Sequence, residues 1–574
     1  MEPPLSAPAR RARWSVFAAW LALAVAVAAV YHGVRRHGFV NFDDPMYLFE
    51  NGHVTPGLTA DGVHWAFTNK DTLQWQPAAW LGHMLVSEVA GMRPVPHLLA
   101  NLLLHALNAG LLFMLLRALT GAPGRSFVVA LLFAVHPVNV ETVAWASQLK
   151  STLSTAFCLG ALSAYVRAAR RGGGFSFAAV GLLVLSLLAK PMMVSFPLLL
   201  ALLDFWPLQR LPAGREPAAW GRWLLEKLPY AVVAGVIVLV TALPWGAHPE
   251  MATVHGVEWP RLAALPCQYF RYLGLVFWPA DLAVLYPEKL DYPPLLEVGA
   301  LLLLLAITSA AWRWRGRHPA LLVGWAWFGL SLFPVSGIVQ LGPQGIADRY
   351  LYVPGIGLLV AVVWLVADVL PARWPARVAG VAAAACIWLA QEQAGHWENS
   401  LTLWSHASAV TAPSAIRHIN LGNALMLAGR DAEAEARLAA AISLAPRDPR
   451  PLVNLAVIAQ RHGDAAKAVG LLRQARALAP ADARICSNLG SLLDDRGEKA
   501  EGRALLETAV QLNPALVEAR INLGVVLAQA GELDAALASF EAAARLKPGD
   551  PAVMHNLELV RGQIAARRPK LIRD

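Results

Sequence analysis

Long apolar segments alternate with short polar ones over residues 1–395, and the pattern changes after that point. About eleven of these segments are long enough to span a membrane as helices, at 14–31, 97–116, 126–143, 151–166, 176–190, 192–207, 229–245, 295–311, 320–335, 353–370 and 376–392. Another segment, 262–278, contains Pro266 and Arg271, and we expect it to lie at the interface or to re-enter without crossing. The pattern predicts an all-α fold that begins with a polytopic helical membrane domain over 1–395.

The C-terminal part repeats every 34 residues, which is the period of tetratricopeptide helical hairpins. Four positions show the period: Pro446, Pro480, Pro514 and Pro548; Asn420, Asn454, Asn488 and Asn522; Gly429, Gly463, Gly497 and Gly531; and Leu421, Leu455, Leu489 and Leu523. Such hairpins bury their apolar faces by stacking, so they form an α-solenoid. We expect four repeats over 415–550, a connecting helix or partial repeat over 396–414, and a capping helix and tail over 551–574.

The composition agrees with a membrane domain joined to a soluble one. Of the 574 residues, 57% are hydrophobic, 15% are charged, and the mean hydropathy is +0.46, whereas soluble proteins carry about 25% charged residues. The net charge of +9 is spread over the flanks of the apolar segments, so it indicates topology and no nucleic-acid partner. The distant cysteines predict neither a disulfide framework nor a zinc site: Cys158, Cys267, Cys386 and Cys486.

The basic residues predict the orientation of the chain. Arg10, Arg11 and Arg13 precede the first apolar segment, which lacks a clear cleavage site, so we expect a retained anchor with a cytoplasmic N-terminus. If each span reverses the chain and 262–278 does not cross, basic residues concentrate in the cytoplasmic loops. The loop 32–93 and the repeats then lie outside. Usage rich in Ala, Leu and Arg favours a bacterial source, so we expect the bacterial inner membrane with periplasmic repeats.

Five groups of polar residues fall on this outer side. They are Asp43, Asp44 and His83 in the loop 32–93; His136 and Glu141 after the third span; Lys150 before the fourth; Lys190 between the fifth and sixth; and Arg349 with Tyr350 before the tenth. The second span adds a stripe on one helix face, with its first member nearest the outer end: His97, Asn101, His105 and Asn108. Ionisable groups gathered at one membrane surface predict a site for a lipid-anchored substrate.

Each group also has a structural interpretation. Asp43 and Asp44 could form a helix cap or a structural cation site, and the stripe could make helix–helix hydrogen bonds. Lys190 could extend to the interface. Glu141 could pair with Lys150 or His136, and Arg349 could pair with Asp348. Their shared side of the membrane is what favours a joint site.

The chain resembles the transmembrane and tetratricopeptide-repeat O-mannosyltransferase family and its bacterial relatives, which are membrane glycosyltransferases of the GT-C type. The matching stretches occur in order along nearly the whole chain: Phe42-Asp43-Asp44 with Tyr47; Gly57-Leu58-Thr59; Trp80-Leu81-Gly82-His83-Met84; Asn101-Leu102-Leu103-Leu104-His105; His136-Pro137 with Glu141 and Val143-Ala144-Trp145; Leu203-Asp204-Phe205-Trp206-Pro207-Leu208; Arg349-Tyr350-Leu351-Tyr352; and Trp404. The family shows an arginine and an aspartate where this chain has Leu149 and Ser151, so Lys150 alone of that motif remains.

The resemblance implies transfer of a sugar, mannose or another hexose, from a polyprenyl-phosphate carrier on the non-cytoplasmic face. The acceptor would be Ser or Thr hydroxyls of a protein or peptide bound by the repeats. It maps the catalytic carboxylate onto Asp43 or Asp44, and we favour Asp43. The remaining candidates contact or support the substrate and its phosphate: Arg349, Lys190, Lys150, His136, Glu141, His83, His97 and Tyr350.

The expected mechanism is a single displacement with inversion at the sugar carbon. An aspartate takes the acceptor proton, and arginine and lysine neutralise the leaving phosphate. No cofactor is required, although an aspartate pair is compatible with a divalent cation.

The rival interpretation is a membrane-anchored tetratricopeptide-repeat scaffold without catalysis. A transporter is a third, but its key charges should lie near mid-membrane, whereas these mostly lie at the ends of the spans.

Overall fold

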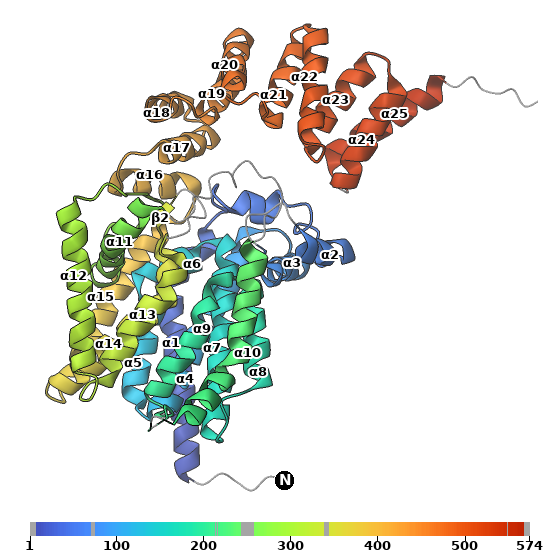
Figure 1. Cartoon of the computed structure of the whole chain (residues 1–574). Helices are drawn as coiled ribbons and strands as arrows, with labels where there is room; N and C mark the ends of the chain where they lie inside the picture. Colours follow the sequence, from blue (N-terminus) through green and yellow to red (C-terminus); the bar gives the residue numbers. More distant parts are fainter. Residues whose placement is uncertain are drawn as a thin grey trace, which may run out of the picture. The chain divides into compact units, whose positions relative to one another are not determined.

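The protein divides into two units, Met1–Ala412 and Pro413–Asp574, in a computed structural model of the whole chain (Figure 1). The structure describes residues 7–69, 75–212, 214, 216–242, 258–337, 344–547 and 549–567. The regular elements of the described residues are helices, apart from one small antiparallel sheet of two strands that are far apart in the chain, β1 (Tyr286–Pro287) and β2 (Gln344–Ile346).

The first unit is a bundle of helices with short helical turns between them. Its first half contains α1 (Ala7–Tyr31), η1 (His32–Arg36), η2 (Pro45–Phe49), α2 (Ala60–Thr68), α3 (Pro77–Ala90), α4 (Pro94–Thr120), α5 (Pro123–Val135), η3 (Pro137–Asn139), α6 (Val140–Ala144), η4 (Ala146–Gln148), α7 (Leu149–Arg170), α8 (Phe177–Ala189), η5 (Pro191–Ser195) and α9 (Phe196–Phe205). Its second half contains α10 (Pro217–Ala242), α11 (Trp259–Phe277), α12 (Pro294–Arg313), α13 (Pro319–Leu332), η7 (Phe333–Val335), η8 (Asp348–Leu351), α14 (Pro354–Val369), α15 (Trp374–His396) and α16 (Ser400–Val410). In Figure 1, α2, α3, α6 and β2 lie at one end of this bundle.

Fewer helices of the described residues are candidates for membrane spans than the apolar pattern predicts. Among the described residues, four helices are long and apolar enough to cross: Ser15–Arg36, Pro94–Thr120, Pro217–Thr241 and Pro294–Arg313. The pair Pro123–Val135 and Pro137–Ala144, bent by 54°, makes a fifth if it counts as one span. The expectation of about eleven spans is therefore not supported, and the orientation, which was derived from that number, stays a prediction.

The difference arises where the apolar segments break or contain polar residues. The runs 176–190 and 192–207 form the short helices α8, with 13 residues, and α9, with 10. The run 151–166 lies in α7, whose first turns contain serine and threonine. Residues 262–277 of the segment 262–278 lie within the single helix α11, which is not among the candidate spans. Run length alone thus counted as spans several helices that are too short or too polar.

Two of the breaks have a direct cause in the sequence. A residue that precedes proline is disfavoured in the helical conformation. Lys190 precedes Pro191 and has an extended backbone (φ −159°, ψ 126°) where α8 ends. His136 precedes Pro137 and is extended (φ −70°, ψ 129°) where α5 ends. These prolines place Lys190 and His136 at helix ends instead of inside continuous spans.

The second unit is a stack of helical hairpins. Its helices are α17 (Ala415–Leu427), α18 (Asp431–Leu444), α19 (Arg450–Arg461), α20 (Ala465–Leu478), α21 (Ala483–Asp495), α22 (Lys499–Leu512), α23 (Val517–Gln529), α24 (Leu533–Leu546) and α25 (Pro551–Arg567). The periodic glycines follow the first helix of each hairpin with φ between 71° and 87°, a region that favours glycine: Gly429, Gly463, Gly497 and Gly531. Three of the periodic prolines follow the second helices, and the fourth, Pro548, lies outside the described residues.

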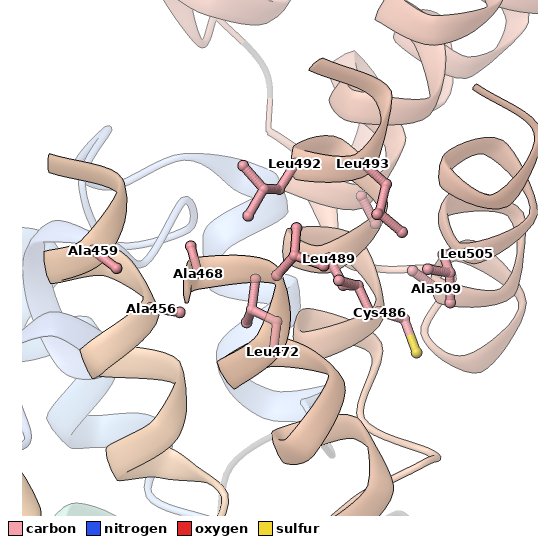
Figure 2. Packing of buried hydrophobic residues seen from close by; sticks show 12 residues of the cluster. Ala456, Ala459, Ala468, Leu472, Cys486, Leu489, Leu492, Leu493, Leu505 and Ala509 are labelled. Carbon is pink, nitrogen blue, oxygen red and sulfur yellow. The ribbon is translucent and has the colours of Figure 1, made fainter. Parts of the chain in front are cut away.

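The core of the stack passes from one repeat to the next. Small side chains of α19 and α20 pack with leucines of α21 and with side chains of α22, as Figure 2 shows for Ala456, Ala459, Ala468, Leu472, Cys486, Leu489, Leu492, Leu493, Leu505 and Ala509. Most of these residues are less than 4% exposed. A single hairpin could not cover such a face, so each repeat depends on its neighbours for stability.

Candidate active site

The neighbouring carboxylates Asp43 and Asp44 occupy different environments in the turn between η1 and η2. Asp44 is 1% exposed. Its Oδ2 accepts a hydrogen bond from the Val40 backbone N–H at 2.9 Å, and its Oδ1 accepts from the Ser147 backbone N–H at 3.0 Å and from the Ser147 hydroxyl. Asp44 begins η2 but makes no side-chain cap bond. Its carboxylate therefore joins the turn to η4 instead of capping a helix.

Burial raises the pKa of Asp44 to about 6, although the hydrogen bonds from Ser147 and Val40 lower it. Desolvation disfavours the charged carboxylate, whereas the donors favour it. With both oxygens occupied by donors of the chain, Asp44 has little capacity to bind a substrate or a cation.

Asp43 is the accessible member of the pair. Its side chain is 30% exposed, and Oδ2 lies 3.4 Å from the Lys150 ammonium. Lys150 also lies 3.8 Å from the centre of the Tyr47 ring. The Tyr47 hydroxyl accepts a hydrogen bond from Gln76 Nε2 at 2.5 Å. Asp43 thus has one neighbouring cation and a face open to a ligand.

Arg349 and Glu141 form a buried ion pair beside this group. The Arg349 guanidinium and the Glu141 carboxylate are in direct contact, and the Arg349 backbone N–H donates to Glu141 Oε2 at 2.7 Å. This pairing differs from the two structural alternatives, in which Glu141 would pair with Lys150 or His136 and Arg349 would pair with Asp348. Asp348 instead accepts a hydrogen bond from the Tyr286 hydroxyl at 2.8 Å.

Lys190 completes the charged group from the break between α8 and η5. Its ammonium nitrogen donates to Ser151 Oγ at 2.8 Å, and Ser151 donates to Gln148 Oε1 at 2.8 Å. Lys190 lies 5.8 Å from the centre of the Tyr350 ring. The Lys190 side chain is buried, so it does not extend to an open interface as one alternative proposed.

The structure therefore brings together predicted residues that are far apart in the sequence. The cluster, which we name the cation cluster, contains Asp43, Glu141, Lys150, Lys190 and Arg349. Two of its cations pair with its two carboxylates, and the third, Lys190, has no carboxylate partner among the described residues. Such a group can bind an anion next to a partly exposed carboxylate.

The three histidines among the predicted site residues lie outside these contacts. His136 donates from Nε2 to the Val276 carbonyl at 3.1 Å and accepts from the Val138 N–H at 3.3 Å. His83 and His97 are buried with ring centres 5.6 Å apart, and their ring nitrogens have no hydrogen-bond partner in the part of the chain described. His136 thus stabilises the bend after α5, and its expected supporting role does not follow from its contacts.

The rest of the polar stripe on α4 connects helices. Asn101 Nδ2 donates to the Trp145 carbonyl at 2.7 Å, and Asn108 Nδ2 donates to the Thr152 carbonyl at 2.9 Å. His105 donates from Nε2 to the Ala134 carbonyl at 3.0 Å and accepts from the Tyr352 hydroxyl at 2.7 Å. These bonds agree with the structural alternative of helix–helix hydrogen bonding.

Ser147, Gln148 and Ser151 contact the site, although the sequence did not identify them as site residues. Ser147 fixes Asp44, and the other two form the chain of hydrogen bonds that begins at Lys190. The available signal was the concentration of hydroxyl and amide residues around Lys150, at Ser147, Gln148, Ser151 and Thr152, within an otherwise apolar region. In the described residues, no group of three or more histidine, cysteine, aspartate or glutamate side chains could hold a metal ion.

Comparison with known proteins gives partial matches. The tetratricopeptide repeat family matches residues 453–517 and 487–551. A protein O-mannosyl-transferase of Drosophila melanogaster, Tmtc1, is 30% identical over 200 residues, which cover 33% of this chain and 22% of that protein. TMTC1 of Mus musculus, also a protein O-mannosyl-transferase, is 29% identical over 179 residues, covering 29% of this chain and 19% of that protein.

This chain therefore carries tetratricopeptide repeats near its C-terminus and is distantly similar to protein O-mannosyl-transferases. The matched segments span about a fifth of the length of these curated relatives. Among solved structures, Pseudomonas aeruginosa PilF is 25% identical with a TM-score of 0.25, covering 26% of this chain and 69% of that one. YrrB, described as a TPR protein with an unusual peptide-binding site, is 23% identical with a TM-score of 0.25, covering 29% and 85%.

Proposed function

We propose that this protein is a membrane glycosyltransferase that moves a hexose from a polyprenyl-phosphate carrier to Ser or Thr hydroxyls of acceptor proteins. The observation that carries the proposal is the cation cluster, in which Lys150 contacts the partly exposed carboxylate of Asp43. Arg349 and Lys190 interact with Asp43 electrostatically without contacting it. The similarity to protein O-mannosyl-transferases supports mannose as the sugar. The N-terminus is cytoplasmic, and the site and the repeats lie on the periplasmic side of the bacterial inner membrane.

Asp43 is the general base in this proposal. It is the more exposed of the two aspartates, and its single cation partner lies at 3.4 Å, so it is available to an acceptor hydroxyl. Asp44 positions Asp43, because its bonds to Val40 and Ser147 hold the turn that carries both residues. A positioned base contributes a rate factor of roughly 10²–10⁴.

Lys150, Lys190 and Arg349 bind the phosphate of the donor. Negative charge grows on the phosphate oxygens as the bond to the sugar breaks, and preorganised cations stabilise that charge. One carboxylate acting as a base, with phosphate as the leaving group, gives a single displacement with inversion at the sugar carbon. The proposal requires no divalent cation, because the three basic side chains supply the positive charge at this position.

The tetratricopeptide repeats bind the acceptor protein. Stacked helical hairpins form extended concave surfaces that suit a peptide. The periodic asparagines lie on the first helices of the hairpins. Two of them bond to a neighbouring first helix, since Asn454 Nδ2 donates to Asn423 Oδ1 at 2.5 Å and Asn522 Nδ2 donates to Ser487 Oγ at 3.1 Å.

The first test is sugar transfer by purified protein in detergent, with a polyprenyl-phosphate mannose donor and a Ser/Thr peptide. We expect Asp43→Asn to lower the rate by a factor of roughly 10²–10⁴, because the base is lost. Asp44→Asn should have a smaller effect, since it disturbs only the turn. Asp61→Asn, an exposed aspartate of α2, serves as the matched control and should retain the wild-type rate. Full activity in Asp43→Asn, with folding intact, would contradict the assignment of Asp43 as the base, and full activity in Asp44→Asn as well would remove the aspartate pair from the mechanism.

The anchored scaffold remains the rival, and the tetratricopeptide repeats favour it as much as they favour acceptor binding. Mass spectrometry of exported proteins from cells with and without this chain separates the two. The transferase predicts loss of a hexose from particular Ser or Thr peptides. Unchanged glycosylation together with a lost protein complex would support the scaffold.

A further inference from the structure

Among the described residues, Lys190 differs from the other basic residues of the cation cluster in having no anionic partner. Lys190 is only 6% exposed, and within the same residues its ammonium nitrogen has one hydrogen-bond acceptor, Ser151 Oγ. Ser151 in turn donates to Gln148, whose Nε2 is buried without a partner among the described residues. Lys150 and Arg349, by contrast, each contact a carboxylate.

The charges that face Lys190 come from several elements. Lys150 of α7 and Arg349 of η8 repel a positive charge on Lys190, while Glu141 of α6 and Asp43 partly offset this repulsion. Tyr350 presents its ring. The helices α8 and α13 and the turn η7 carry no titratable side chain. On α9 and α10, the carboxylates of Asp204 and Glu226 both pair with Lys227 and with Arg210, which follows α9. The other titratable residues of α10 are Arg222 and Tyr230.

A buried amine in such surroundings favours its neutral form. Transfer of an unpaired ammonium out of water is costly, and a lysine avoids the cost by releasing its proton. Burial and the two neighbouring cations accordingly lower the pKa of Lys190 well below its ordinary value. An arriving phosphate ester supplies the missing negative charge and reverses this preference.

We propose that binding of a phosphate ester at the cation cluster is coupled to the uptake of one proton by Lys190. The proton comes from solvent and forms the third N–H bond of the ammonium group, which then donates to a phosphate oxygen while keeping its bond to Ser151. No other bond forms or breaks in this step. The inference rests on the proposed function, and it adds that donor binding depends on pH through a residue that does not act as the base.

The test is isothermal titration calorimetry of the full chain in detergent with farnesyl methyl phosphate, a phosphodiester that does not itself titrate near neutral pH. At each of several pH values, binding is measured in two buffers with different ionisation enthalpies, which gives the affinity and the number of protons taken up at that pH. We expect an uptake of about one proton by the wild type above the free-state pKa of Lys190, and an affinity that falls by about tenfold per pH unit there.

Two variants isolate the residue. Lys190→Arg stays charged at all accessible pH values, so it should bind the diester without proton uptake and without the fall in affinity. Lys190→Met is neutral and should bind more weakly, also without uptake, which covers the case in which the arginine variant fails to fold. Lys150→Arg should keep the uptake, because burial is outweighed at Lys150 by Tyr47 and Asp43, which raise its pKa.

Binding by the wild type without proton uptake, or the same uptake in Lys190→Met, would overturn the inference and leave the proposed function intact. If the wild type does not bind the diester, the inference fails as well. The transfer assay with mannose donor and peptide then decides the proposed function separately, because it scores product and not proton uptake.

Discussion

Asp43 and Asp44 are adjacent in the chain, and the direction of each side chain decides what its carboxylate can do. Asp44 faces inward to Ser147, a residue 103 positions later in the chain. Asp43 faces Lys150 and keeps 30% of its side chain exposed. A base must reach its substrate, so the exposed residue is the better candidate. The buried one is better suited to fixing the geometry of the turn.

The buried position of Asp44 predicts a specific pH dependence of stability. Burial raises the pKa of Asp44 from 3.8 to about 6, so between these values the folded chain binds more protons than the unfolded chain. The Asp44 contribution to stability is complete below about pH 4 and is lost as the pH rises through about 6, a change on the order of 3 kcal/mol. Asp44→Asn removes this pH-dependent contribution of the Asp44 carboxyl. Thermal unfolding in detergent should therefore show that the stability of the variant increases relative to that of the wild type as the pH rises.

The exposed Asp61→Asn variant is the control for this measurement, and its stability should run parallel to that of the wild type between pH 4 and pH 7. A constant difference between Asp44→Asn and the wild type over the same range would contradict the assigned environment of Asp44.

The residue types at the site could be predicted, but their contacts could not. The family resemblance, and the expected position of the polar groups on one side of the membrane, indicated the site residues from the sequence: Asp43, Lys150, Lys190 and Arg349. The partners of these residues depend on how separate segments pack, and no local pattern contains that information. His136 illustrates the limit, because its neighbour Pro137 breaks the helix and turns the imidazole toward the Val276 carbonyl.

Helix ends carry most of the functional geometry in the first unit. The extended residues before Pro137 and Pro191 stop α5 and α8 and give rise to the breaks near which the cation cluster forms. The break at Pro191 also contributes to the excess of predicted spans. The predicted spans 176–190 and 192–207 on its two sides form α8, with 13 residues, and α9, with 10, and neither is among the candidate spans.

A second buried charge cluster stabilises the other end of α9. The Asp204 side chain is fully buried and contacts Lys227 at 2.7 Å and Arg210 at 3.3 Å. It also accepts hydrogen bonds from the Tyr165 hydroxyl and from Trp223 Nε1. Asp204→Ala leaves the two cations poorly compensated, so we expect a loss of about 3–5 kcal/mol of stability, measured by unfolding in detergent.

The matched control for Asp204 is Asp368 of α14, which pairs with Arg125 at 2.8 Å near the surface. Partly exposed pairs contribute about 0–1 kcal/mol, so Asp368→Ala should change stability little. Equal losses in the two variants would show that burial of the Asp204 cluster does not stabilise the packing of α7, α9 and α10.

At the scale of the whole molecule, the repeats could be predicted almost completely, because their pattern is local and periodic. Proline, glycine and leucine recur at fixed spacing, and each has a local structural reason in the hairpin. The first unit has no such period, so its helix breaks, the pairing of β1 with β2 and the contacts of Arg349 come only from the folded structure. The boundary between the units falls at Ala412, after α16, whereas the predicted connecting segment ran from 396 to 414.

The division into two units predicts separate effects on catalysis and on acceptor capture. A chain ending at residue 412 keeps the cation cluster, so it should transfer sugar to a short soluble peptide with nearly the same kcat as the full chain. A linked binding domain raises the effective concentration of an acceptor at the site, so loss of the repeats should raise KM for a protein acceptor by roughly 10²-fold or more. Steady-state kinetics with both acceptors measures the effect, and Asp43→Asn in the full chain provides the opposite pattern, a loss of kcat with either acceptor. An unchanged KM for the protein acceptor would mean that the repeats serve a partner other than the substrate.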